Sequence, residues 1–145
     1  MKTWLKILII LAVIGLITAF LLWKFLINKP HTDYSKAKAE VEVLAPELFN
    51  QFTANKVNAD QNYTGKVIQL KGNISKIEQN DTSAIVIFVF RQGEFGDEGI
   101  RCILLTEEKA KISGMKPNQE LTLKGYCTGY NDADVIVEKC VLINK

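Results

Sequence analysis

Three cysteines are the residues of this chain that could form a disulfide or carry out redox chemistry. Cys127 and Cys140 lie on the two arms of a predicted C-terminal hairpin, so a disulfide between them is one hypothesis. In a tight hairpin Cys127 would face Ile136, and this disulfide therefore requires a longer loop or a bulge. Cys102 with Cys140 is the alternative pair, and three small buried thiols are the third interpretation.

The sequence lacks a pattern typical of a metal centre or of nucleophilic catalysis. It contains no Cys-x-x-Cys, and its one histidine, His31, lies in a polar Lys-Pro-His-Thr-Asp segment where we expect it to be solvated. Acidic residues gather in residues 93–99 and at Asp132 and Asp134, but their spacing differs from that of an EF-hand loop. We interpret them as solvated turn residues and predict no metal, no cofactor and no enzymatic activity.

Aromatic and basic side chains in the second half of the chain could form a binding face. Aromatic rings stack on bases, and basic groups between them attract phosphates. The candidate binding residues are Phe88, Phe90, Arg91, Phe95, Arg101, Tyr126 and Tyr130. The formal net charge of the chain is +2, but the part after Pro30 carries 14 basic and 16 acidic residues. Because this part is mildly acidic, a nucleic acid is not expected as the partner.

A long apolar segment near the N-terminus predicts a transmembrane helix. Residues 7–23 contain no charged side chain, and Trp4 and Trp23, nineteen positions apart, correspond to about 28 Å of helix. Indole rings favour the headgroup region, and Lys6 and Lys24 can extend outward from the two ends. A cleaved signal peptide is the alternative, but residues 20–26 offer no small side chains for a cleavage site.

The short tail before this segment is typical of a signal anchor that leaves the following domain outside the cytoplasm. We therefore predict a single-pass membrane protein whose soluble domain lies on the extracytoplasmic (periplasmic) side. Residues 1–29 form the predicted anchor, residues 30–44 a polar tether without a sustained period, and residues 45–145 one folded domain.

An amphipathic helix is expected at the start of the folded domain, with Pro46 in its first turn. We interpret its apolar face as a surface that packs against a sheet. That face comprises Leu48, Phe52, Ala59 and Tyr63.

Five strands are predicted after this helix, from alternating apolar residues and turn residues. Gly72 marks an expected bend in the first strand, and the second strand is apolar on both faces. The elements are strands at 66–77, 84–90 and 100–105, a loop at 93–99, a short helix at 106–115 and a closing hairpin at 121–142. This order predicts a mainly β fold, a five-stranded OB barrel with a preceding amphipathic helix and a short helix between its third and fourth strands.

Several ordered sequence features resemble one known family. The matching positions are Asn55, Ala59-Asp60, Tyr63-Thr64-Gly65-Lys66-Val67, Gly72-Asn73-Ile74, Gly99-Ile100-Arg101-Cys102, residues 123–130, Asp134-Val135 and Cys140. Together they are similar to the tRNA_anti-like OB-fold family, small bacterial envelope proteins that often follow a membrane segment or a lipoprotein signal. The resemblance covers residues 45–142 and implies a fold related to anticodon-binding domains, without implying an RNA partner or a known activity. Leu44 departs from it, because the family more often has a Ser or Thr helix cap there.

The sequence therefore predicts a membrane-anchored, non-enzymatic OB domain of the bacterial cell envelope that contacts another envelope protein or a small ligand. A domain that binds single-stranded nucleic acid or oligosaccharide is the alternative. A weak enzyme or redox protein that uses Cys102, Cys127 or Cys140 is a third hypothesis.

Overall fold

The computed structural model describes residues 2–26 and 33–143, which belong to two separate units divided between residues 32 and 33. His31 and the first part of the predicted tether lie outside the described residues. The two units are considered separately below.

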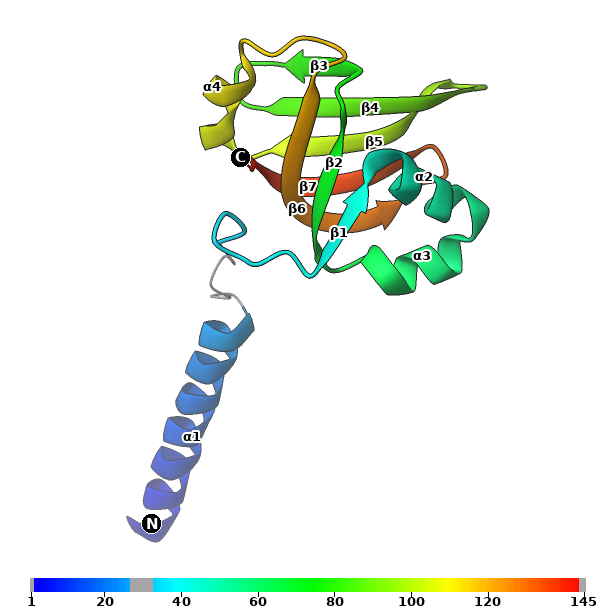
Figure 1. Ribbon diagram of the computed structural model, residues 1–145. Coiled ribbons are helices and arrows are strands. Elements are labelled where there is room, and N and C mark those ends of the chain that lie inside the picture. The colour runs from blue at the N-terminus through cyan, green and yellow to red at the C-terminus, as the bar shows by residue number, and fades with distance from the viewer. Residues whose placement is uncertain (1, 27–32, 144–145) are drawn as a thin grey trace. The chain divides into compact units, whose positions relative to one another are not determined.

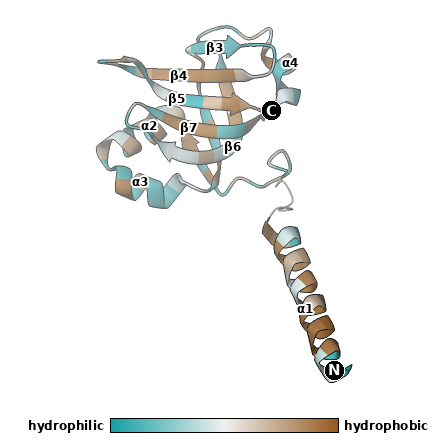
Figure 2. Cartoon of the chain, turned by 180° about the vertical axis from the view of Figure 1, so that it is seen from behind, coloured by the Kyte–Doolittle hydropathy of each residue, from teal (hydrophilic) through white to brown (hydrophobic). Residues whose placement is uncertain are grey.

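The first unit contains one helix, α1 (Lys2–Leu26), which is predominantly hydrophobic along its length (Figure 2). It is long and apolar enough to cross a membrane, a test that a signal sequence at this position would also pass. The hydroxyl group of Thr18 donates to the carbonyl oxygens of Ile14 and Gly15, at 3.0 and 2.9 Å. The polar atom of this side chain is therefore satisfied within the helix itself.

The second unit is a mainly β domain with several short helices (Figure 1). Its elements in chain order are β1 (Val41–Leu44), α2 (Ala45–Ala54), α3 (Lys56–Tyr63), β2 (Val67–Asn73), β3 (Lys76–Gln79), β4 (Ala84–Gly93), β5 (Gly96–Leu104), the 3₁₀ helix η1 (Thr106–Glu108), α4 (Lys109–Ile112), β6 (Glu120–Tyr130) and β7 (Asp134–Leu142).

The seven strands form one sheet in the order β1-β2-β6-β7-β5-β4-β3, in which β1–β2 and β5–β7 are parallel pairs. We predicted five strands, and the number differs because β1 was not expected and the predicted first strand is divided into β2 and β3. Two residues separate β2 from β3: the amide of Ile74 donates to Gln119, and that of Ser75 donates to Ile87. No hydrogen-bonded ladder between the described strands joins the two ends of the sheet.

The core lies between the strands and is closed by helices at both ends. β2 and the first part of β6 cross β4 and β5 at a steep angle, β6 then bends to run antiparallel to β7, and the α2–α3 pair and α4 lie at opposite ends of the sheet (Figure 1). The largest fully buried side chains include Phe52, Phe88, Ile68, Ile100 and Ile112. Gly72, predicted to mark a bend, lies one residue before the end of β2 and also permits close packing, since a Cβ there would lie 2.7 Å from the Cβ of Ala45.

The predicted amphipathic helix is two helices, α2 and α3, and its four apolar-face residues are all buried. The chain breaks at Asn55, whose side-chain oxygen accepts the backbone N–H of Asn58 at 3.1 Å and so caps α3. At the start of α2, Leu44 makes no side-chain cap, which agrees with its departure from the family pattern. β1 leads directly into the helix, and Pro46 in the first turn has no N–H group that would need a cap.

The described part of the predicted tether, residues 33–44, packs on the domain. Val41–Leu44 is strand β1 and pairs with β2, with Val41 opposite Ile68. Just before β1, the amide of Glu40 donates to the carbonyl of Val67 at 2.8 Å. The folded domain therefore begins before residue 45, the boundary that composition alone predicted.

The predicted loop at 93–99 is mostly strand. β4 and β5 remain paired to Gly93 and Gly96, which leaves Glu94 and Phe95 as a two-residue turn. Gly96 has a φ of +126°, a conformation that side-chain-bearing residues rarely adopt. The result is a tight hairpin, which agrees with the hairpin-like loop that the sequence predicted here.

Candidate functional site: an aromatic rim with paired charges

Four aromatic rings from three elements meet near the β6–β7 turn, and we call them the aromatic rim: Phe49, Phe52, Phe90 and Tyr130. The ring centroids of Phe49 and Phe90 lie 5.5 Å apart, and those of Phe52 and Tyr130 lie 6.0 Å apart. Phe49 and Phe52 are buried, whereas Phe90 is 38% exposed and Tyr130 is half-buried. Phe90 and Tyr130 therefore form the part of the rim that a partner can reach.

Local backbone structure places Phe90 at the rim. It shares the inward face of β4 with Phe88, but the register with β5 shifts between Val89 and Arg91, so Phe90 has no partner residue on β5. Its ring packs instead on Phe49 of α2, since α2 lies over this end of the strands.

Two basic side chains border the rim, and each has a carboxylate partner. The guanidinium of Arg91 lies 5.8 Å from the ring centroid of Phe49 and donates through Nε to Glu98 at 2.6 Å. This hydrogen bond raises the pKa of Arg91. Lys56 Nζ lies 5.7 Å from the ring centroid of Tyr130 and 3.0 Å from Asp132 Oδ1. Burial raises the pKa of the Tyr130 hydroxyl group, so it stays neutral.

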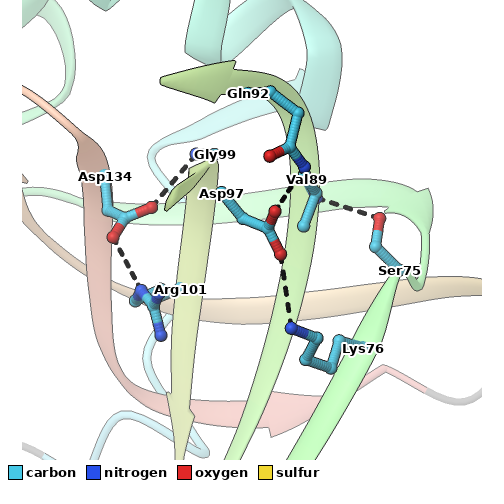
Figure 3. A network of polar contacts seen from close by, with 8 residues as sticks. All are labelled: Ser75, Lys76, Val89, Gln92, Asp97, Gly99, Arg101 and Asp134. Atoms are coloured by element: carbon cyan, nitrogen blue, oxygen red, sulfur yellow. Dashed lines mark hydrogen bonds and ion pairs between the residues drawn. The ribbon is translucent and has the colours of Figure 1, made fainter. Parts of the chain in front are cut away.

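Two further ion pairs lie on the neighbouring strands (Figure 3). Asp134 accepts from Arg101 Nε at 2.6 Å and from the Gly99 amide at 3.0 Å. Asp97 accepts from Gln92 and from Lys76, the latter at 3.3 Å, and these two bonds lower the pKa of its carboxyl group.

We call the region formed by β3, β4, β5, the β6–β7 turn with Asp134, and Lys56 the rim side. Of the residues that the structure describes there, four are basic and five are acidic. Each of the four basic groups is within 3.3 Å of a carboxylate oxygen. The rim side thus presents aromatic surface without an excess of positive charge.

The predicted binding residues fall into several places. Phe90, Arg91 and Tyr130 come together at the rim, and Arg101 lies in the Asp134 ion pair. Phe95 is fully exposed at the hairpin tip. Tyr126 stacks on Tyr34, in a different region.

The inclusion of Phe88 as a contact residue is corrected by the structure, because its side chain is 0% exposed within the core. The sequence analysis missed Phe49 and Lys56, which complete the rim. Phe49 directly follows Leu48 in the amphipathic helix. A wider apolar face that included Phe49 would have predicted its burial from the sequence.

The family model of tRNA_anti-like proteins matches residues 1–141, which include α1 and nearly all of the domain. The chain belongs to the tRNA_anti-like family. No curated protein is significantly similar to it.

The domain of this tRNA_anti-like protein resembles solved structures at low sequence identity. A candidate nucleic acid-binding lipoprotein from Klebsiella pneumoniae is 16% identical, with a TM-score of 0.52 over 80% of this chain and 100% of that chain. The OBody AM3L15 bound to hen egg-white lysozyme is 16% identical, with a TM-score of 0.39 over 58% and 81% of the two chains. The Stn1–Ten1 complex of S. pombe is 13% identical, with a TM-score of 0.34 over 55% and 59%. The family and the Klebsiella structure establish an OB-type fold.

The three cysteines of the tRNA_anti-like protein are buried free thiols. A bulge places Cys127 opposite Val137, one residue beyond the predicted Ile136. The thiol of Cys140 lies next to that of Cys102. Of the two predicted disulfides, Cys102–Cys140 is therefore the pair whose side chains are in contact. Burial raises the pKa of Cys127 to about 11 and also raises that of Cys140. Among the described residues, no three His, Cys, Asp or Glu side chains are grouped closely enough to hold a metal ion.

Proposed function

We propose that this tRNA_anti-like protein is a membrane-anchored, non-enzymatic binding module of the bacterial cell envelope that contacts another protein through its aromatic rim. The proposal has four parts: the anchor, the barrel, the absence of enzymatic activity and the contact surface. Each part has its own support, and experiments on the anchor and the contact surface test the proposal.

The anchor part assigns α1 as an uncleaved single span with the domain on the extracytoplasmic side. Its support is the length of α1, the tryptophans at both ends and the absence of small residues in 20–26. Mass spectrometry of the intact protein from its native membrane tests it. A full-length mass is expected, and a mass that begins beyond Trp23 would make the segment a cleaved signal peptide.

The barrel part treats β2 and β3 as the two halves of one bent strand. That strand pairs with β6 through its first half and with β4 through its second half. With the parallel β5–β7 pair, five strands then surround the core in the manner of an OB barrel. The amide of Ile74 donates to Gln119, just before β6, and the amide of Ser75 donates to Ile87 of β4. The chain between β2 and β3 thus remains hydrogen-bonded on both sides, which supports this interpretation.

The non-enzymatic part rests on the chemistry of the thiols. A cysteine nucleophile must be ionised near neutral pH, whereas burial holds the pKa of Cys127 at about 11. The other two cysteines are also fully buried, and the only histidine of the sequence precedes the domain.

The single observation that carries the protein-contact assignment is the pairing of all four basic groups on the rim side. Phosphate recognition requires basic groups that are free to release counterions. Protein interfaces instead favour aromatic and arginine side chains that are already held in place. Phe90, Tyr130 and Arg91 have this character, and Phe95 adds an exposed apolar side chain at the tip of the β4–β5 hairpin.

Site-specific photo-crosslinking in the full-length protein tests the contact surface. A photoreactive residue at Phe95 is expected to capture one dominant protein in native membranes, and the same group at the exposed Leu44 is the matched control. The Phe90→Ala change should weaken the Phe95 crosslink roughly tenfold or more, because central aromatic anchors dominate binding energy. Equal capture at both positions, or no effect of Phe90→Ala, would contradict the assignment.

Single-stranded nucleic acid or oligosaccharide is the second candidate ligand, favoured by the accessible rings of Phe90 and Tyr130 beside Arg91. Binding of single-stranded DNA that weakens steeply with salt would support it. The triple variant D97N/E98Q/D132N is informative here, since it frees Lys76, Arg91 and Lys56. We expect measurable DNA binding by the variant alone, and equal binding by the unmodified chain would favour the nucleic-acid function.

A further inference from the structure

A second surface lies where the chain enters the domain, and we call it the entry patch: residues 33–40 with Lys124, Tyr126 and Lys139. The ring centroids of Tyr34 and Tyr126 lie 5.6 Å apart, and Lys139 Nζ lies 4.8 Å from the centre of the Tyr34 ring. Lys124 Nζ donates to the carbonyl of Ser35 at 3.0 Å. Residues 33–40 are therefore held against the outward-facing side chains of β6 and β7.

A bulge in β7 presents Lys139 to this patch. The register between β6 and β7 shifts between Lys124 and Tyr126, and Lys139 has a φ of +52°. A residue with a side chain adopts positive φ at a cost, and such strain persists where the surrounding structure enforces it. Here the bulge turns the Lys139 side chain outward, over the Tyr34 ring.

The lysines of the entry patch differ from those of the rim side in their partners. Within the described part of the chain, Lys38, Lys124 and Lys139 have no carboxylate oxygen within 4.0 Å, whereas Lys36 pairs with Asp33.

The acidic groups of the region are engaged elsewhere or recessed. Asp33 also accepts from Ser35, and Glu40 accepts the Val67 amide at 3.3 Å. Glu138 lies opposite Tyr126 in the ladder and is half-buried. Lys124 and Lys139 therefore lie beside the two tyrosines without a carboxylate partner among the described residues.

We infer that the entry patch binds anionic phospholipid headgroups. Lysines near an anionic bilayer surface attract it electrostatically, and tyrosine rings favour the headgroup region. The patch begins seven residues after the last residue of α1 in the sequence, so the connecting chain can span at most about 25 Å and keeps these lysines within reach of a bilayer that holds α1. This inference rests on the proposed anchoring function and adds a lipid class to it.

The test uses the full-length protein reconstituted in vesicles of phosphatidylcholine with or without phosphatidylglycerol. Amide hydrogen exchange is measured in residues 33–40 and 120–142 for the unmodified chain and for the K38Q/K124Q/K139Q variant. The matched control K56Q/K76Q/K116Q removes three lysines outside the patch. Comparing the two lipids within each protein cancels any change that a substitution makes in the free domain.

Phosphatidylglycerol is expected to slow exchange in the entry patch of the unmodified chain and of the control. In K38Q/K124Q/K139Q this difference should fall by more than tenfold, because each lysine contributes about a fivefold factor to the attraction. High salt should also reduce it. The same exchange rates in both lipids, or full retention in the variant, would overturn the inference.

Vesicle flotation separates this inference from the anchoring proposal. A chain that floats with phosphatidylcholine vesicles but shows no phosphatidylglycerol effect is anchored and lacks the headgroup site. A chain that fails to float with phosphatidylcholine is not anchored by α1. In that case flotation with phosphatidylglycerol vesicles alone would still support the entry patch, and its absence would overturn it.

Discussion

Basic side chains have opposite environments in the rim side and the entry patch. On the rim side Lys56, Lys76, Arg91 and Arg101 are each paired with a carboxylate. In the entry patch Lys38, Lys124 and Lys139 have no such partner among the described residues. Both regions contain aromatic rings, so the difference between them lies in charge pairing. Composition alone, with 14 basic and 16 acidic residues after Pro30, describes neither region.

A nearly neutral domain can therefore present two different surfaces, one whose basic side chains are paired with carboxylates and one whose basic side chains are not. Paired cations hold the strands and the rim in place and leave aromatic surface for a partner. Unpaired cations remain available to an external anion. Substitutions and pH changes in each region should therefore have separable effects.

Asp134→Ala should cause the largest loss of stability, because it removes the acceptor of both Arg101 and the Gly99 amide. Loss of charge-assisted bonds at a largely buried carboxylate costs about 2–3 kcal/mol. Urea unfolding of the full-length protein in detergent measures it. Asp132→Asn is the control, since the Asp132 side chain is 81% exposed and asparagine tolerates the positive φ of this position. Equal stability of the two variants would show that the rim-side pairs are not structural.

Alkaline pH should weaken the core that lies beneath both regions. The pKa of Cys127 is raised by burial to about 11, against an ordinary value of 9.0. Its stabilising contribution is therefore complete below pH 9 and is lost as pH rises towards 11, by about 2 kcal/mol. The unfolding free energy of the unmodified chain should fall more steeply over this range than that of Cys127→Ala. Parallel pH profiles would mean that Cys127 is already oxidised or accessible.

Tyr34→Ala should loosen the entry patch without affecting the rim. It removes a ring stacked on Tyr126 and a cation–π contact with Lys139, together worth about 1–2 kcal/mol. Amide exchange in residues 33–40 should accelerate by roughly tenfold, while exchange in α2 and β4 stays unchanged. Tyr34→Phe keeps the ring and should behave as the unmodified protein. Acceleration throughout the domain would show that the two regions are coupled.

Lys56→Gln should have the smallest effect, because the Lys56–Asp132 pair is exposed. Pairs of this kind contribute about 0–0.5 kcal/mol at moderate salt. Thermal unfolding should place the variant within that range of the unmodified protein. A larger loss would mean that the cation–π contact with Tyr130 stabilises the rim itself.

Much of the fold was readable from the sequence because its signals are local. Alternating apolar residues predicted β2, β5 and β6, and the turn residues predicted the last hairpin. The ordered motifs predicted the tRNA_anti-like family, which the family match confirms. The apolar run predicted a helix at the N-terminus, and α1 is that helix.

Features that depend on distant residues were not readable. β1 has four residues, too few for a period, and its partner β2 lies more than twenty residues later. Two register shifts, around Gly125 and Thr128, place Cys127 opposite Val137 and not opposite the predicted Ile136. The register of a hairpin depends on such bulges as well as on its turn. The rim required α2 to bring Phe49 onto Phe90 across forty residues of chain.

The position of β7 has a consequence for how the protein is made. The last strand of the sequence is the central strand of the sheet, held between β6 and β5. A chain that emerges from its N-terminus first cannot complete its core until residues 134–142 have appeared. The complete sheet can therefore form only after most of the domain has been synthesised. Deletion of this final strand would remove the centre of the sheet and not merely one of its ends.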